Sequence, residues 1–301
     1  SALLLLSVVG LSILYSASGQ DMDIIFRQLI RLGIGFAVMF ILAQVPSHHI
    51  ERWSPWIFSL GLGLMIAVLV IGEIGKGAQR WLDLGLFRFQ PSEIMKISVP
   101  MMLAWYFHDK TLPPSLSHLL MGAFLTIVPT LLIAKQPDLG TALLICSSGL
   151  FVLLLAGIYW RVVISLVLAV IPLGWLFWNY GMHDYQRSRV ITFLNPETDP
   201  LGSGYHIIQS KIAIGSGGVY GKGWLNGTQS HLEFLPERST DFIFAVFSEE
   251  FGLIGTVFLL ILYLFIIFRG LYIATQAQST FARLLAGSLI LTFFVYVFVN
   301  I

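Results

Sequence analysis

The sequence predicts an all-α protein, a polytopic bundle of transmembrane helices with one large polar loop. The chain is 56% hydrophobic and only 11% charged, whereas soluble domains are about 45–50% apolar and about 25% charged. Its mean hydropathy is +0.83. A single long polar segment, residues 181–240, interrupts the apolar runs. Such a chain places most of its residues in lipid and concentrates its polar chemistry in one loop.

Long apolar runs account for most of the chain. A helix needs about 20 mainly apolar residues to cross the hydrocarbon core, and about nine runs are of that kind. The runs are centred near Leu6, Phe36, Leu64, Met101, Leu125, Leu150, Leu168, Leu259 and Leu291. Three of them contain a proline, at Pro100, Pro129 and Pro172, where we expect kinks. We therefore predict a single membrane domain over residues 1–301.

The two ends of the chain look like cuts. The chain begins with Ser1, and its last apolar run is unfinished at Ile301, so we expect truncation at both ends. The first run is interpreted as an anchor helix rather than a signal peptide, because many further spans follow it. Lysines and arginines are almost evenly divided between alternate short loops, which leaves the orientation in the membrane open.

Charge and cysteine content exclude several function classes. The net charge is +1 with both signs scattered, so no basic tract predicts nucleic-acid binding. The single cysteine, Cys146, lies in an apolar run and has no partner for an intrachain disulfide. The seven histidines lack metal-ligand spacing, so no zinc site is expected. Glu237, Asp241 and Asp184 could together hold a hard divalent ion, although loop carboxylates are more often solvated.

Polar residues interrupt the spans at three places. In the first, residues 76–93, Pro91 stands near a first helical turn that Ser92 or Gln90 could cap. The second is the short segment 135–140. The third is the 181–240 loop, whose second half is glycine-rich and is expected to be irregular or tightly turned. Its glycines match neither a P-loop nor a dinucleotide fingerprint.

Asp241 stands where the polar loop gives way to an apolar run, at a predicted helix N-terminus. A carboxylate there could cap the helix by accepting backbone N–H bonds. It could instead accept a proton as a general base. Position alone favours the cap, because capping by aspartate is common.

Further charges lie inside predicted spans. Glu93 and Lys96 are three residues apart, so a helix places them on one face, within reach of an ion pair. Charges inside a span are costly and commonly face a cavity, which makes the pair a functional hypothesis. The alternative is a pair that only joins two helices. Of Glu249 and Glu250, one could be protonated or paired with a cation from another span, and the sequence does not say which.

Several ungapped strings resemble the SEDS family of bacterial cell-wall synthesis, in particular its rod-shape members. They are KGAQRWLDLG at residues 76–85, FQPSE at 89–93, QPDLGT at 136–141, GYHIIQSKIAIGSGG at 204–218 and FLPERSTDFIFA at 234–245. The resemblance covers essentially the whole chain. It implies a multi-pass protein of the bacterial cytoplasmic (inner) membrane, with about ten spans in the family fold and the large loop outside the cytoplasm.

The resemblance also implies an activity. SEDS proteins are peptidoglycan glycosyltransferases, which polymerise lipid II, an undecaprenyl-pyrophosphate-linked disaccharide, into β-1,4 glycan strands. The rod-shape members act during cell elongation and rod-shape maintenance, in complex with a class B penicillin-binding protein. The essential family aspartate falls on Asp241, and the polar pair of the fourth span falls on Glu93 and Lys96. The resemblance thus favours the base over the cap at Asp241.

The implied reaction displaces a sugar pyrophosphate with inversion, by attack of a sugar hydroxyl. It needs a base at the hydroxyl and cations at the departing pyrophosphate. Asp241 is the predicted base, and loop cations, with or without a divalent ion such as Mg or Mn, are expected at the leaving group. The predicted substrate-binding residues are Glu93, Lys96, Arg187, Lys211 and Arg238.

Two other function classes stay open. Intramembrane charges such as Glu93, Lys96 and Glu249 also suit a flippase for the lipid-linked precursor. A flippase path should cross both leaflets, whereas the loop cations here gather on one side. The third class is a non-enzymatic scaffold of the elongation complex, which predicts that Asp241→Asn leaves function intact.

Overall fold

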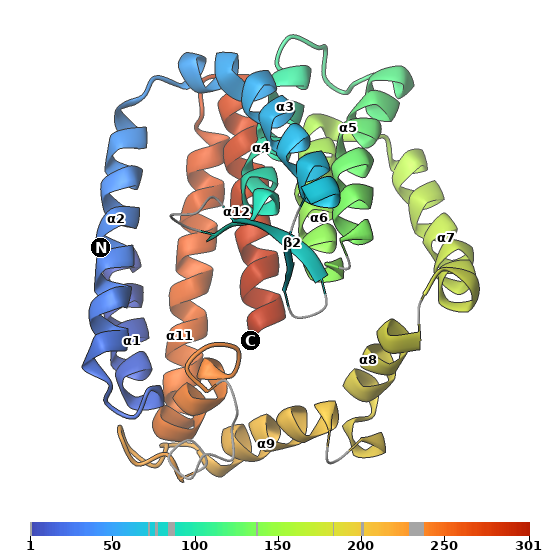
Figure 1. Cartoon of the computed structure of the whole chain (residues 1–301). Helices are drawn as coiled ribbons and strands as arrows, with labels where there is room; N and C mark the ends of the chain where they lie inside the picture. The colour runs from blue at the N-terminus through green and yellow to red at the C-terminus, as the bar shows by residue number, and fades with distance from the viewer. Residues whose placement is uncertain are drawn as a thin grey trace. The chain divides into compact units, whose positions relative to one another are not determined.

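The computed structural model describes residues 2–71, 73–75, 78–83, 88–136, 138–182, 184–199, 202–228 and 238–301. Helices dominate this part of the chain (Figure 1). They are α1 (Ala2–Ala17), α2 (Met22–Gln44), α3 (Ser47–Ile71), α4 (Pro91–Phe107), α5 (Leu116–Lys135), α6 (Leu139–Gly157), α7 (Trp160–Leu176), α8 (Asp184–Leu194), α9 (Ser203–Ser216), α11 (Ile243–Thr275) and α12 (Thr280–Asn300). The all-α prediction is confirmed.

Each predicted span centre lies inside a helix, in α1 to α7, α11 or α12. Among the described residues, six helices are long and apolar enough to cross a membrane. They are Met22–Gln44, Ser47–Val70, Leu116–Lys135, Leu139–Gly157, Ile243–Thr275 and Thr280–Asn300. α1, at 16 residues, and α4 and α7, at 17 residues each, are shorter than a full span. The chain is therefore a multi-pass membrane protein.

A small antiparallel sheet precedes α4. Its strands are β1 (Glu73–Gly75), β2 (Ala78–Asp83) and β3 (Arg88–Phe89), in the order β1-β2-β3. Trp81 pairs with Glu73, and Leu82 pairs with Phe89. The sequence analysis did not predict these strands, because they are too short to show a clear period-two alternation.

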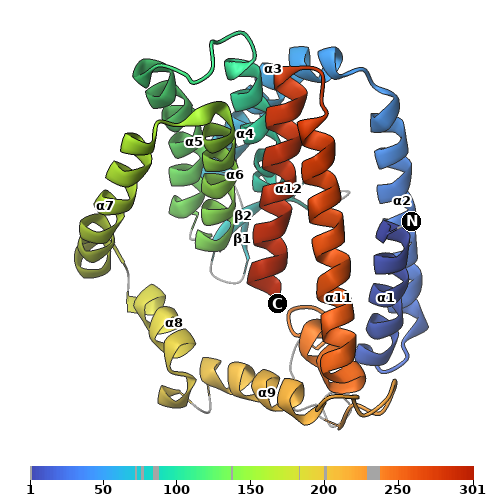
Figure 2. The same cartoon turned by 180° about the vertical axis from the view of Figure 1, so that it is seen from behind.

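The large loop is more helical than predicted. A π-helical turn, Phe177–Gly181, leads to α8, and a 3₁₀ turn, Pro196–Thr198, lies between α8 and α9 (Figure 2). The expectation of irregular structure is wrong for Ser203–Ser216, which form α9 despite two glycines. A glycine in a helix costs only about 1 kcal/mol relative to alanine, so neighbouring residues can outweigh it. The predicted tight turns begin after α9, at Gly217.

The chain divides by its contacts into two compact units. Unit 1 is Ser1–Leu42, Ile164–Ile266 and Asn300–Ile301, and unit 2 is Ala43–Val163 and Ile267–Val299. The core of unit 2 includes Met65, Met95, Phe107, Ile145 and Phe281. The core of unit 1 includes Ile13, Ala17, Ala213, Val246 and Phe247. Each unit thus has a buried apolar core of its own.

Candidate functional site

Asp241 lies in a turn directly before α11, where the sequence places it. Residues 238–242 form turns, and the helix begins at Ile243. The Asp241 side chain is exposed. No hydrogen bond or ion pair joins its carboxylate to another residue that the structure describes. The carboxylate is therefore accessible to an external group that carries a proton.

α11 is interrupted at Gly252. This residue has φ 64° and ψ −163°, which no α-helix contains. The carbonyls of Glu249 and Glu250 accept instead from the backbone N–H groups of Lys222 (3.0 Å) and Gly223 (2.9 Å). In an unbroken helix these carbonyls would accept from residues 253 and 254.

The same turn also satisfies the amides beyond the break. Leu253 N–H donates to the Gly218 carbonyl at 3.0 Å, and Ile254 N–H donates to the Val219 carbonyl at 3.2 Å. Segment 217–223, which we call the docking turn, therefore takes the place of the missing helical hydrogen bonds. Buried backbone groups need such partners, since leaving them unpaired is costly.

Three glycines make this close approach possible. A Cβ on Gly217 would meet the Ser248 carbonyl, and one on Gly221 would meet the Glu250 carbonyl. A Cβ on Gly252 would meet the Gly221 nitrogen. Gly221 and Gly252 also have positive φ values, 77° and 64°, which other residues rarely adopt. The glycine-rich segment is thus a backbone docking device.

Two buried carboxylates lie beside the break. Glu249 is 0% exposed, and Lys222 Nζ contacts its Oε1 at 2.7 Å. Thr228 Oγ1 donates to the same oxygen at 3.1 Å. Ser16 Oγ of α1 donates to Oε1 of Glu250, which is 1% exposed. The cation at Glu249 therefore comes from the loop rather than from another span. The sequence reasoning missed this pair, because 27 residues separate its members.

α1 holds the same part of the loop from another side. Trp224 Nε1 donates to the Ser12 carbonyl at 3.2 Å, and its ring centroid lies 6.1 Å from that of Tyr15. A Cβ on Gly19, just after α1, would lie 3.8 Å from the Arg238 guanidinium. The loop from Lys222 to Trp224 is therefore bound to both α1 and α11 within unit 1.

The predicted loop cations have different environments. Arg187 donates from Nε to the Trp178 carbonyl at 2.9 Å and from Nη2 to the Asn179 carbonyl at 2.8 Å, so it stabilises the π-helical turn. Lys211 is exposed on α9, and Arg238 is half-buried three residues before Asp241. Of the three cations, Arg238 is the nearest to the predicted base along the chain.

Glu93 and Lys96 belong to unit 2, and the predicted ion pair between them is confirmed. Lys96 Nζ lies 2.7 Å from Glu93 Oε1, on the first turns of α4. It also lies over the Tyr296 ring of α12, 5.2 Å from the centroid. The Glu93 side chain is 56% exposed, whereas that of Lys96 is 17% exposed. The pair therefore presents its acidic member more openly than its basic one.

A polar cluster in unit 2 joins the polar insertions. Arg80 Nε donates to the Gln136 carbonyl at 3.3 Å, and its Nη1 lies 3.9 Å from Asp138 Oδ2. Gln90 Nε2 donates to the same Asp138 oxygen at 3.3 Å. Pro91 begins α4 as predicted, but Gln90 makes no side-chain cap there. The cluster was not predicted, because its members lie far apart in sequence.

The described residues contain no group of three or more His, Cys, Asp and Glu side chains placed to hold a metal ion. Of the three proposed carboxylates, Glu237 lies outside the described residues. The Oδ1 atom of Asp184 lies 3.6 Å from Nη1 of Arg187, so these two side chains form an ion pair. The divalent ion therefore stays a prediction from the sequence, and no step below depends on it.

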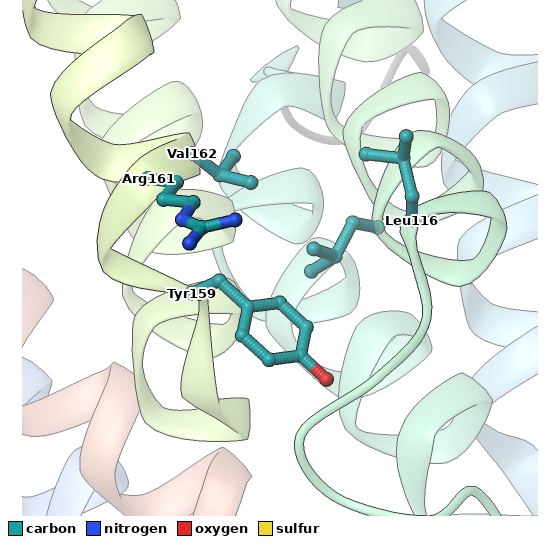
Figure 3. Close-up of a pocket in the computed structure, with 5 residues that line it drawn as sticks. Leu116, Tyr159, Arg161 and Val162 are labelled. Atoms are coloured by element: carbon teal, nitrogen blue, oxygen red, sulfur yellow. The ribbon is translucent and has the colours of Figure 1, made fainter.

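Two cavities lie within single units. One, of about 590 Å³, is lined in unit 2 by Leu116, Leu119, Tyr159, Arg161 and Val162. Arg161 and Tyr159 lie across it from Leu116 (Figure 3). The other, of about 600 Å³, is an apolar groove in unit 1, whose lining includes Val8 and Val9 of α1 and Phe247, Phe251 and Phe258 of α11. Neither is lined by a predicted site residue.

Comparisons with known proteins agree over nearly the whole chain. A family model described as a cell cycle protein family, FtsW, RodA and SpoVE, matches residues 1–301. Peptidoglycan glycosyltransferase MrdB of Escherichia coli (strain K12) is 55% identical over 302 residues, which cover 99% of this chain and 81% of that protein. Stage V sporulation protein E of Bacillus subtilis (strain 168) is 33% identical over 317 residues, which cover 99% of this chain and 84% of that protein.

Solved structures show the same likeness. A chain from work on the structural coordination of polymerization and crosslinking by a peptidoglycan synthase complex matches with a TM-score of 0.84 and 27% identity, over 99% of this chain and 84% of that one. The rod shape determining protein RodA of Thermus thermophilus matches with a TM-score of 0.72 and 25% identity, over 99% of this chain and 81% of that one. The fold is thus shared by proteins that differ widely in sequence.

Proposed function

We propose, from the premise that the chain belongs to the SEDS family of FtsW, RodA and SpoVE cell cycle proteins, that it is a peptidoglycan glycosyltransferase. It polymerises lipid II into β-1,4 glycan strands during cell elongation and rod-shape maintenance. The observation that carries this conclusion is 55% identity, across 99% of the chain, to an enzyme with that activity in its name. The proposed activity is that of an inverting glycosyltransferase with an undecaprenyl-pyrophosphate-linked substrate.

Asp241 is the proposed general base. Its exposed carboxylate takes the proton from the acceptor sugar hydroxyl as that oxygen bonds to the anomeric carbon. The bond from the anomeric carbon to the pyrophosphate oxygen breaks on the opposite face, so the configuration inverts. The electron pair leaves with the undecaprenyl pyrophosphate. The exposure of this carboxylate, which has no hydrogen bond to another described residue, supports this role.

Cations stabilise the departing pyrophosphate. Arg238, three residues before the base, and Lys211, exposed on α9, are the proposed contacts. Arg187 also holds the π-helical turn, so it would bind substrate only with its remaining donors. Glu93 and Lys96 are also proposed as substrate-binding residues. A Mg or Mn ion could assist at the pyrophosphate, and its requirement is tested by chelation.

The proposed location is the bacterial cytoplasmic (inner) membrane, with the large loop on the extracytoplasmic side, where glycan strands are laid down. There the protein works with a class B penicillin-binding protein, which cross-links the new strands. A solved synthase complex that couples polymerization to crosslinking supports this partnership. Accessibility of a cysteine introduced at exposed Lys211 to an impermeant maleimide tests the side of the loop.

Asp241→Asn tests the activity directly. The full-length protein is purified with its transpeptidase partner and given lipid II, and glycan polymer is measured. We expect polymer formation to fall at least about 100-fold, since general-base catalysis contributes about 10²–10⁴. Wild-type polymer from the variant would show that Asp241 is not the base or that the protein acts as a scaffold. Unchanged complex assembly is the control for folding.

A further inference from the structure

The break at Gly252 separates α11 into two parts with different tasks. Residues 253–275 extend over about 35 Å at 1.5 Å per residue. This length alone crosses a hydrocarbon core of about 30 Å. Segment 243–251, which we call the base helix, is therefore not needed for spanning. It begins two residues after Asp241, and its last turn carries the buried carboxylates of Glu249 and Glu250.

The base helix transmits any movement at its far end to Asp241. The helical part, from Ile243 to the break at Gly252, covers nine residue steps, or about 14 Å along the helix axis. A tilt of about 10° at the break would therefore displace Asp241 by about 2 Å. A misplacement of about 1 Å can lower a rate about 100-fold. Catalysis by Asp241 thus depends on how firmly the Glu249 end is held.

We propose that Lys222 and Glu249 are positioning residues for Asp241. Their ion pair holds the docking turn in the gap at Gly252 and so fixes the tilt of the base helix. This inference rests on the proposed function, since it concerns the geometry of the same base. Neither residue is placed in contact with substrate.

Apolar packing alone does not supply this orientation. Ala245 and Val246 belong to the same buried cluster as Ile13 and Ala17 of α1, but apolar contact is non-directional. The Lys222 ammonium contacts Glu249 Oε1 at 2.7 Å and Thr228 Oγ1 at 2.6 Å. Charge-assisted hydrogen bonds at a fully buried carboxylate are short, strong and directional. These hydrogen bonds therefore favour one tilt of the base helix over slightly different tilts.

The backbone bonds of the docking turn depend on the same pair. Lys222 provides both the N–H that bonds the Glu249 carbonyl and the ammonium that bonds the Glu249 side chain. The two residues are therefore joined twice, through main chain and through side chain. Loss of the side-chain bond leaves a buried carboxylate without its cation, which favours opening of the turn.

The experiment compares Lys222→Met, Glu249→Gln, the double variant and Lys222→Arg in the full-length protein with its partner. Initial polymerisation rates are measured over a range of lipid II concentrations. We expect kcat to fall at least about tenfold in both single variants, with KM changed less than about twofold because no substrate contact is lost. Lys222→Arg retains the charge and should recover most of kcat.

A second readout separates positioning from general loss of fold. Hydrogen exchange should become faster in the base helix of Lys222→Met and stay unchanged in residues 256–275. The control is Lys110→Met, because Lys110 is a half-buried loop cation beside the Tyr106 ring in unit 2 and lies outside the junction at Gly252. It should leave both kcat and exchange at wild-type values.

Each outcome decides the proposal. Wild-type kcat in the double variant overturns it, because that protein has neither charge and still positions its base. A rise in KM at constant kcat also overturns it and makes Lys222 a substrate contact. If Lys222→Met does not fold, the double variant carries the test. Should Asp241→Asn keep full activity while Lys222→Met lowers kcat, the assignment of the base fails and the pair positions another group.

Discussion

The two units of this protein are stabilised by different devices. In unit 2, helices approach through small residues: Gly61 lies against Met95, and Gly149 lies against Thr126. In unit 1, a loop is inserted into the backbone of a broken helix, beside a buried ion pair. Close packing of small residues is ordinary for membrane helices. Inserted turns are confined to places where protein, not lipid, surrounds the backbone.

The two devices should respond differently to substitution. The apolar core of unit 2 should tolerate substitutions that conserve volume. The junction in unit 1 depends on four backbone hydrogen bonds and one ion pair that connect segments far apart in sequence.

The largest effect is expected from Gly252→Ala, which places a side chain where the docking turn contacts the break in α11. The new Cβ would collide with the Gly221 nitrogen, and the positive φ would be strained. We expect the free energy of unfolding to fall by about 3 kcal/mol, measured by thermal unfolding in detergent. Gly174→Ala in α7 is the matched control, since nothing lies within 4 Å of its Cβ position. Equal stability of both variants would contradict the inserted-turn geometry.

A smaller effect is expected from Gly149→Ala in unit 2. Its Cβ would meet the Thr126 side chain across the α5–α6 contact, and overpacking costs about 1–3 kcal/mol. Because the obstacle is a side chain, adding Thr126→Ala should return part of the lost stability. If the double variant recovers no stability, the new Cβ collides with backbone, as at Gly252, rather than with the Thr126 side chain. Thermal unfolding of the two variants decides between these cases.

Lys96→Met should have the smallest effect on stability. Its partner Glu93 is 56% exposed, and exposed ion pairs contribute about 0–1 kcal/mol. We expect a change below about 1 kcal/mol in unfolding, together with a raised KM for lipid II if the pair binds substrate. A loss of stability above about 2 kcal/mol with normal KM would support a pair that only joins helices.

The sequence predicts the parts of this fold that depend on local pattern. All nine span centres fall in helices, and the Glu93–Lys96 pair follows from a spacing of three residues. The short strands, α9 and the docking turn do not follow from any period in the sequence. Glu249 could be recognised as costly in an apolar run, but its partner Lys222 is identified only by the folded chain.

The docking turn has a consequence for how this sequence can change length. Four hydrogen bonds pair residues 218, 219, 222 and 223 with residues 249, 250, 253 and 254. Surface loops commonly accept insertions. One residue added between Val219 and Lys222 would instead shift two of these bonds out of register. Homologous chains should therefore vary in loop length on either side of this segment and keep its residue count fixed.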